Sequence, residues 1–427
     1  MDEKKYLPRL VDNKLEKYLR IFGAVSIEGA KWCGKTWTGL KYAKSVSYLT
    51  DKSVRNLAEV DPKYIFTDER PQLIDEWQIV PPIWDSVRHA CDEAAHPGNF
   101  ILTGSTTLAK EEGEGEVYHT GTGRIATLKM YPMSLLESGD SDGKITIEDM
   151  FDGKTKGQNL RKVELHTLAH LAVRGGWPNN LQILAEDAGE IPKSYIESIV
   201  TRDIHERKDR KRDPEKMRML IRSLARNEST VAGNDTLVKD IEAYENEGEL
   251  IESRHTVADY LGVLNDLYLT SDQPAFSINY RSSQRVGKSP KRHLVDPSLA
   301  CAALGLTEEK LLNDHNTFGL IFEALMERDL RIYAEYLGGR LYHFRDNASG
   351  DEVDAIIELD DSRYAAFEIK LSDNAIQEGI DSLVEFEKGV KRKPEFLCVI
   401  VGHLEAAYQD PDSGVYIVPA TSLGVRR

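Results

Sequence analysis

The stretch GAKWCGKT, from Gly29 to Thr36, is the first place where residue types and spacing suggest chemistry. It matches the phosphate-loop pattern G-x-x-x-x-G-K-[ST] in full. It stands between an apolar run and an amphipathic stretch, which is the strand–loop–helix context that the pattern requires. In that context backbone N–H groups and a helix N-terminus face an anion. The alternative is a chance glycine turn that binds nothing.

The residues of this loop predict a site for ATP and Mg²⁺, although nothing in them separates ATP from GTP. Lys35 would reach the β- and γ-phosphates, and Thr36 would offer its hydroxyl to Mg²⁺. The variable positions point away from the phosphates, so bulky side chains are tolerable there. The residues that we expect to line the nucleotide are Gly29, Ala30, Lys31, Trp32, Cys33, Gly34, Lys35, Thr36 and Trp37.

Two acidic residues end the apolar run in QLIDEWQ (72–78). Asp75 would hold the Mg²⁺ through water, and Glu76 would orient or deprotonate the attacking water. Taken alone, such a pair is usually a surface turn. Downstream of a phosphate loop, at the end of an expected strand, it indicates a Walker B motif.

Two further candidates follow the Walker B motif. Ser105, with Thr103 as the alternative, ends the strand-like FILTGST and could sense the γ-phosphate, although a cap at the start of a loop is the plainer interpretation. Arg124 is a candidate arginine finger, a side chain that stabilises the transferring phosphoryl group. A lone arginine is more often structural, and a finger acting on another chain would need a homo-oligomer.

A second group of charged residues lies in EVDAIIELDDSRYAAFEIK (352–370). Strand alternation puts Glu368 and Lys370 on one face, and a hairpin in register would bring Asp354 alongside Glu368. Two such carboxylates could bind a divalent metal, with Glu323 on the preceding helix as a further ligand. Lys370 could then activate or position a water for phosphodiester attack. The alternative is a pair of amphipathic strands with solvated charges.

The elements that must position these residues fall into three expected domains of an α/β chain. Residues 1–150 alternate strand-like and helical stretches, which predicts a parallel sheet, and the polar stretch 138–157 marks its end. Residues 151–304 are helical, with a winged-helix-like pattern in TVADYLGVLNDLYLTSD. Residues 305–427 read as a long helix followed by the strands RLYHFRD, EVDAIIEL, YAAFEIKL and FLCVIV, a second α/β unit.

Composition limits the partners. A formal net charge of −16 excludes a protein that coats nucleic acid with its whole surface, but a local basic patch remains possible at 281–292. The other basic cluster, 202–218, interleaves both signs and indicates first a solvated helix face. The acidic segment EEGEGE (111–116) predicts a mobile loop. No apolar run reaches the length of a membrane span, and four scattered cysteines fit reduced thiols in a cytoplasm rather than structural zinc.

The segments taken together resemble a family of prokaryotic AAA-type ATPases that carry a C-terminal domain of unknown function with a nuclease-like fold. The matching motifs are YLPRLVDNKLEKYLRIFGAVSIEGAKWCGKT, PQLIDEWQIVP, FILTGST, GRIATLKMYPMSLLE, GGWP, YIESIVTRDI, YLGVLNDLYL, KSPKRHLVDPSLACAALG and GDEVDAIIE. The C-terminal part is similar to the PD-(D/E)xK nuclease core, with Val353-Asp354 where that signature normally has Pro-Asp.

The resemblance implies an AAA-like P-loop domain, a helical winged-helix-like middle and a restriction-endonuclease-like α/β domain. It implies nucleotide and magnesium roles for Lys35, Thr36, Asp75 and Glu76, and it places Arg124 where the family has its arginine. The loop departs from the family at residues 31–33, where arginine, glutamine or valine are commoner; we expect this to alter loop packing more than binding.

Three functions are compatible with these residues and motifs. The first is an ATPase whose nucleotide state moves the winged-helix and nuclease-like parts, with DNA as the partner, and we rank it first. The second is a nucleotide-dependent switch that binds a protein or nucleic acid with no significant turnover. The third is a metal-dependent nuclease gated by ATP.

Overall fold

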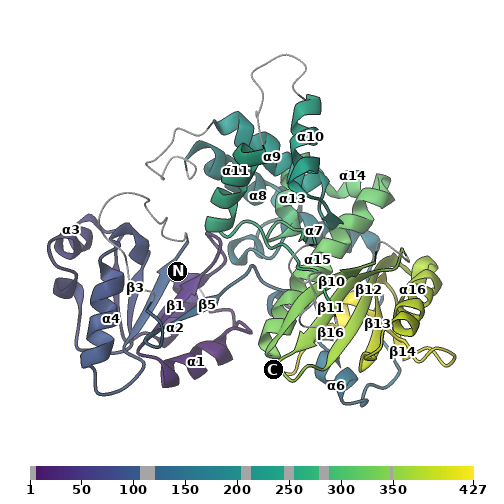
Figure 1. The fold of residues 1–427 in the computed structure, drawn as a ribbon, viewed down its shortest axis with the longest axis horizontal. Coiled ribbons are helices and arrows are strands. Elements are labelled where there is room, and N and C mark those ends of the chain that lie inside the picture. Colours follow the sequence, from purple (N-terminus) through teal and green to yellow (C-terminus); the bar gives the residue numbers. More distant parts are fainter. Residues whose placement is uncertain (1–5, 106–120, 203–212, 245–253, 278–287, 347–349) are drawn as a thin grey trace. The chain divides into compact units, whose positions relative to one another are not determined.

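The computed structural model describes residues 6–105, 121–202, 213–244, 254–277, 288–346 and 350–427 (Figure 1). The chain divides into two compact units. Unit 1 comprises Met1–Pro132 together with Leu264–Leu269, and unit 2 comprises Met133–Val263 together with Thr270–Arg427. Within the described ranges, no helix combines the length and the apolar character that a membrane span needs. The predicted loop at 111–116 lies outside the described residues.

Unit 1 is built on a five-stranded parallel sheet in the order β2-β3-β4-β1-β5, which confirms the parallel α/β sheet predicted from the sequence. The strands are β1 (Ala24–Glu28), β2 (Ser45–Tyr48), β3 (Gln72–Asp75), β4 (Phe100–Gly104) and β5 (Ile125–Lys129). The helices are α1 (Asp12–Ile21), α2 (Lys35–Tyr42), α3 (Lys52–Val60) and α4 (Ile83–Glu93), with 3₁₀ turns η1 (Pro62–Ile65) and η2 (Trp77–Ile79).

Both faces of this sheet are covered, which explains the continuous apolar strands of the sequence. Val25 and Ile27 pack with Leu15 of α1 in one cluster. Ala24, which points to the opposite face, packs with Val87 of α4 in the other cluster. A sheet buried on both sides holds its strand ends rigidly, and the functional residues of unit 1 stand at those ends.

Unit 2 contains a seven-stranded mixed sheet in the order β10-β11-β12-β13-β15-β14-β7. Its strands are β7 (Gln158–Asn159), β10 (Gly339–Arg345), β11 (Glu352–Leu359), β12 (Tyr364–Ser372), β13 (Phe396–His403), β14 (Ala406–Gln409) and β15 (Tyr416–Pro419). The long helix predicted before these strands is α15 (His315–Tyr336), and α16 (Ile376–Gly389) follows β12. The helix and the four strands expected from the sequence are therefore present.

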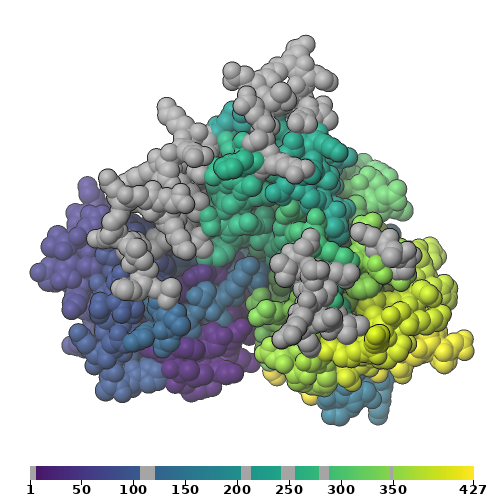
Figure 2. All heavy atoms as spheres, in the orientation of Figure 1, coloured from purple at the N-terminus to yellow at the C-terminus, as the bar shows by residue number. Residues whose placement is uncertain are grey.

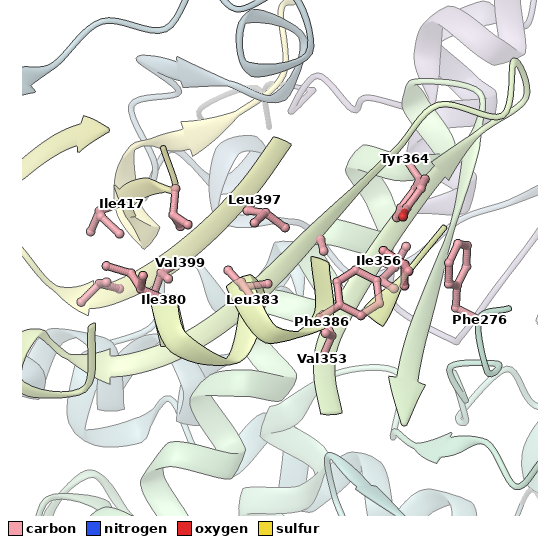
Figure 3. Packing of buried hydrophobic residues seen from close by; sticks show 14 of the residues in the cluster. Phe276, Val353, Ile356, Tyr364, Ile380, Leu383, Phe386, Leu397, Val399 and Ile417 are labelled. Carbon is pink, nitrogen blue, oxygen red and sulfur yellow. The ribbon is translucent and has the colours of Figure 1, made fainter. Parts of the chain in front are cut away.

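The core of this part lies between α16 and the sheet. Figure 3 shows Ile380, Leu383 and Phe386 of α16 pointing toward strand residues such as Val399 and Ile356. The space-filling view in Figure 2 shows that side chains fill the spaces left between the ribbons of the yellow C-terminal segment. Burial of these apolar side chains drives the helix onto the strands.

The middle of the chain is helical, as predicted. Its helices are α7 (Leu165–Arg174), α8 (Glu190–Thr201), α9 (Pro214–Arg226), α10 (Asn234–Tyr244), α11 (Arg254–Asp266), α13 (Pro297–Leu304) and α14 (Glu308–Asn313), with 3₁₀ turns η3 (Pro178–Asn180) and η4 (Ala185–Asp187). The strands β8 (Thr230–Val231) and β9 (Lys291–Arg292) pair antiparallel. After α11 the chain makes isolated bridges, Thr270 with Leu294 and Gln273 with Lys291. The winged-helix comparison itself stays a prediction.

The division into units differs from the expected boundaries at 150 and 304. The polar stretch that we took for the end of the first domain belongs to unit 2. Just before this stretch, the Leu135 N–H of α5 (Leu135–Ser138) donates to Asp329 of α15 at 2.9 Å. The remaining short elements are β6 (Ile145–Thr146), α6 (Ile147–Phe151), η6 (Asp373–Ala375), η7 (Ala420–Ser422) and β16 (Leu423–Gly424), and β6 pairs with β16. Polar residues dominate this stretch, but Ile145, Ile147 and Met150 within it are buried apolar side chains.

The motif GGWP also joins distant parts of unit 2. The Gly176 N–H donates to Asp296 at 3.0 Å, and the Trp177 indole donates to Ser298 at 2.9 Å. A Cβ atom on Gly176 would lie 2.1 Å from the carbonyl oxygen of Met133, so only glycine fits.

Candidate active site

The phosphate loop links the end of β1 to the start of α2, as the sequence predicts. A Cβ atom on Gly29 would lie 2.1 Å from the Met130 carbonyl oxygen, and Gly34 has φ of 107°, so both positions require glycine. Trp32 has φ of 67° and is 46% exposed. Left-handed backbone costs a residue with a Cβ about 1–2 kcal/mol, so the loop holds Trp32 under strain.

Lys35 points back into its own loop. Its ammonium is buried and donates to the carbonyl oxygens of Gly29 at 2.9 Å and Ala30 at 2.8 Å. Cys33 is buried as well, whereas Trp37 on the first turn of α2 is exposed. A cation and a helix start therefore face the centre of the loop, which is the environment that a phosphate needs.

Arg9 is a residue of this site for which we had predicted no role. Its guanidinium donates to the carbonyl oxygen of Cys33 at 2.7 Å and to that of Tyr131 at 2.8 Å. It thereby ties the loop to the chain that follows β5. The signal was present in the tyrosine–proline–arginine opening of the sequence, but spacing alone did not show what the arginine binds.

Thr36 and Asp75 meet, as expected for a magnesium position. The Thr36 hydroxyl donates to Asp75 Oδ1 at 2.8 Å, and the Thr103 hydroxyl donates to the same oxygen at 2.6 Å. Burial raises the pKa of Asp75, and the hydrogen bonds from Thr103 and Thr36 oppose that rise. Hydroxyl and carboxylate oxygens side by side are the hard donors that Mg²⁺ prefers, so these residues fit the ion.

Glu76 has left-handed backbone, with φ of 56° and ψ of 47°. Its N–H donates to Thr103 Oγ1 at 3.2 Å, and its carboxylate accepts from the Ser105 hydroxyl at 3.0 Å and from the amide of Gln78. The structure thus gathers Glu76, Ser105 and Asp75 at the carboxyl ends of β3 and β4. Gln78 was missed by sequence reasoning, because a polar residue after a Walker B motif carries no spacing signal of its own.

Arg124 lies at the opposite edge of the sheet. It directly precedes β5, its carbonyl oxygen accepts from the Ala24 N–H at 3.0 Å, and its guanidinium pairs with Asp92 of α4 at 2.7 Å. Five residues of parallel strand, roughly 16 Å, separate this edge from the phosphate loop. The structure does not bring Arg124 to the site of its own chain, so a finger role requires a neighbouring subunit.

In unit 2 the hairpin of β11 and β12 has the predicted character. Ala355 pairs with Phe367, and the same register continued by one residue would set Asp354 opposite Glu368. The Ile369 N–H donates to Asp354 at 2.8 Å, and the Lys370 ammonium lies 3.0 Å from Glu368. Burial, followed by the charge of Asp354, raises the pKa of Glu368 to about 8.

A lysine that we did not predict stands among the expected metal ligands. The Lys291 ammonium donates to Glu323 and to Glu327 at 2.8 Å, and it lies 3.8 Å from Asp354. Burial disfavours the charge of Lys291, but these carboxylates outweigh it and raise its pKa well above the usual range. Across the parts of the chain that the structure describes, no group of three or more His, Cys, Asp or Glu is arranged to hold a metal ion.

The structure describes only part of the candidate basic patch at 281–292 and of the mixed-charge stretch at 202–218. Residues 281–287 of the first and 203–212 of the second lie outside the described ranges. In the described part, Lys291 is buried and Arg292 pairs with Asp272 and donates to Asn234 at 2.8 Å. Arg218 of the second cluster pairs with Glu197 at 2.7 Å. Among the described residues of the two stretches, Lys291 and Arg292 therefore serve internal contacts, whereas Arg218 forms a surface ion pair.

Comparison with known proteins gives three family matches and distant structural ones. Residues 22–138 match an AAA domain, and residues 165–310 and 318–423 match two domains of unknown function, DUF8612 and DUF4143. None of the curated proteins matches the chain.

Two solved structures illustrate the structural similarity. One is a Walker-type ATPase of Pyrococcus abyssi, 13% identical with a TM-score of 0.39, covering 68% of this chain and 94% of its own. The other is the ORC2 protein of Aeropyrum pernix in ADPNP and ADP complexes, 12% identical with a TM-score of 0.32, covering 74% of this chain and 98% of its own.

The AAA match contains the phosphate loop, Asp75 and Glu76 on the parallel sheet of unit 1. It confirms the P-loop fold predicted for the N-terminal part. The PD-(D/E)xK and winged-helix comparisons are supported by no match and stay predictions. Residues 22–138 are thus similar to the AAA domain of P-loop ATPases.

Proposed function

We propose that the chain binds ATP together with Mg²⁺ and hydrolyses it. The observation that carries this proposal is the contact of Thr36 with Asp75 at 2.8 Å, because it brings the loop hydroxyl and the Walker B carboxylate to one point. Thr36 and Asp75 would hold Mg²⁺ there, and the ion would supply positive charge against the charge that develops on the phosphates. The match to an AAA domain supports the same activity.

In this proposal Lys35 changes partners when ATP enters. Its ammonium now donates to two loop carbonyls, and it would exchange these contacts for β- and γ-phosphate oxygens. Backbone N–H groups of the loop and the start of α2 would hold the β-phosphate. Glu76 would orient the attacking water and accept its proton, with Ser105 and Gln78 fixing the carboxylate.

Segment 264–269 offers a route by which nucleotide state could reach the rest of the chain. The Tyr268 hydroxyl donates to Glu28 Oε2 at 2.6 Å, and Glu28 directly precedes the loop glycine Gly29. Tyr268 has φ of 57°, a strained backbone that a shift of Glu28 would relax or tighten. We propose that turnover moves the helical and nuclease-like parts through this contact. DNA or a protein is the partner of that movement.

The test is ATP hydrolysis with Mg²⁺, with and without DNA, for the full chain and for Glu76→Gln. We expect turnover to be lost in Glu76→Gln while ATP still binds. Glu59→Gln, the same change on an exposed carboxylate of α3, is the matched control and should leave turnover unchanged. Stimulation by DNA would identify the class of partner.

Two outcomes would change the proposal. If ATP binds but the unmodified chain hydrolyses no more than Glu76→Gln, the nucleotide acts as a switch ligand instead. If Arg124 acts on a neighbouring subunit, turnover per chain should rise with protein concentration, and Arg124→Ala should remove that rise.

A further inference from the structure

We propose that the ammonium of Lys291 is the permanent cation of the carboxylate cluster in unit 2, in the place where a metal-dependent nuclease would bind a divalent ion. The cluster consists of Glu323 and Glu327 of α15 and Asp354 of β11. The proposal does not depend on ATP hydrolysis, because it concerns only residues of unit 2.

The contacts show that the lysine occupies the cluster rather than bordering it. Its ammonium is hydrogen-bonded to Glu323 and to Glu327 Oε1 at 2.8 Å, with Asp354 Oδ1 at 3.8 Å. The Lys291 side chain is 2% exposed and that of Glu327 is 1% exposed. A divalent ion takes six or more oxygen ligands at about 2.0–2.6 Å, so it would have to displace the ammonium from the same oxygens.

The backbone holds Lys291 in this place. Its N–H donates to the carbonyl oxygen of Gln273 at 3.0 Å, and its carbonyl accepts from the Gln273 N–H at 2.9 Å. Lys291 also pairs with Val231 in the two strands β8 and β9. The main chain at Lys291 is therefore held on both sides, so the side chain starts from a fixed point beside the carboxylates.

A buried histidine lies beside the same carboxylate cluster. His293 is buried, with one ring nitrogen 3.0 Å from Glu228 and the other 3.1 Å from Glu327 Oε2. The second oxygen of Glu327 thus faces a ring nitrogen of His293, while its first oxygen accepts from Lys291. On the other side of the cluster, Asp354 Oδ2 accepts from the Ile369 N–H at 2.8 Å. Each of these contacts uses a carboxylate lone pair that a metal ion would otherwise take.

The charges explain why a cation is needed at all. Several buried carboxylates without a positive neighbour repel one another and lose their hydration, which is costly in a protein interior. In a metal-binding site the bound ion compensates these negative charges. In this chain the ammonium of Lys291 compensates them. The catalytic lysine expected from the sequence is likewise engaged, since Lys370 pairs with Glu368 at 3.0 Å and Glu378 at 3.2 Å.

The first test measures Mn²⁺ binding to the full nucleotide-free chain carrying Asp75→Asn, which removes the magnesium position of unit 1. We expect no saturable Mn²⁺ binding by calorimetry or electron paramagnetic resonance. Saturable binding that disappears on adding Asp354→Asn would overturn the proposal. Metal-dependent cleavage of DNA that Asp354→Asn abolishes would overturn it equally.

The second test measures the acetylation rate of the Lys291 ammonium by mass spectrometry. Lys291 should react far more slowly than Lys288, which lies three residues away and bonds only the carbonyl oxygen of Arg345 among its described contacts. The rate at Lys291 should be unchanged by Mn²⁺. Equal reactivity of the two lysines, or Mn²⁺-dependent labelling of Lys291, would contradict the proposal.

The third test uses stability. Lys291→Met should lower the Tm of the full chain, and Lys288→Met should not. Adding Glu323→Gln to Lys291→Met should recover part of the lost Tm, because it removes one uncompensated buried charge. A Lys291→Met chain as stable as the unmodified chain would refute the proposal. If that variant fails to fold, the binding and labelling tests decide the question on the unmodified lysine.

Discussion

Replacement of Gln78 by leucine tests whether the hydrogen bonds around Glu76 set the rate of hydrolysis. Gln78 donates to the Glu76 carboxylate and, at 3.4 Å, to the Ser105 hydroxyl, whereas the residues that we propose to contact the nucleotide lie on the phosphate loop. A hydrogen bond to a charged group contributes about 1.5–3 kcal/mol. Leucine has a similar size but no donor, so Glu76 would lose that restraint while its left-handed backbone strain remains.

If the restraint acts in the transition state, a loss of this size lowers kcat by roughly ten- to a hundredfold. KM for ATP should stay nearly constant, because no loop contact changes. The assay is steady-state ATP hydrolysis by Gln78→Leu, with Gln377→Leu on the exposed face of α16 as the matched control. A raised KM with unchanged kcat would show that Gln78 serves nucleotide binding, and the reasoning from Glu76 would be refuted.

Two further predictions concern the stability of unit 2. Burial, aided by the charge of Lys291, lowers the pKa of His343 to about 4, so between pH 6.5 and 4 the unfolded chain binds a proton that the folded chain does not. The free energy of unfolding should therefore fall with falling pH, and this group should contribute about 3 kcal/mol of the fall at pH 4. Urea titrations should show that His343→Phe removes this contribution. The control His315→Phe, on the exposed start of α15, should not remove it. Gly176→Ala should lower the Tm measurably, since the added Cβ would lie 2.1 Å from a backbone oxygen. Gly319→Ala should not lower it, because a Cβ there would have nothing within 4 Å. Equal Tm values for the two variants would contradict the close approach at Gly176.

The sequence predicted the parts of the site that follow one another along the chain. The phosphate loop, Asp75 and Glu76 lie at strand ends of a parallel sheet, so their order and apolar context were enough to expect their meeting. The same holds for the hairpin that sets Asp354 beside Glu368, because alternation and register are local properties.

What the sequence did not reveal depends on contacts between distant segments. Lys291 stands in a run of basic residues, and such a run indicates a solvated surface unless the fold brings carboxylates to it. The contact of Arg9 with the Cys33 carbonyl and the main-chain contact of Leu135 with Asp329 also join segments that lie far apart in the sequence. For Arg124 the sequence did not show which edge of the sheet it occupies, because its distance along the chain carries no such information.

Tyr268 has a consequence for any attempt to take the protein apart. Residues 264–269 belong to unit 1, while the chain on both sides of them belongs to unit 2, so the polypeptide passes between the units three times. A fragment ending at Pro132 would lack the hydroxyl that binds Glu28, and a fragment starting at Met133 would carry that tyrosine without its acceptor. A single cut after Pro132 therefore cannot release an intact unit 1, and truncation of the gene at that point would yield two incomplete pieces.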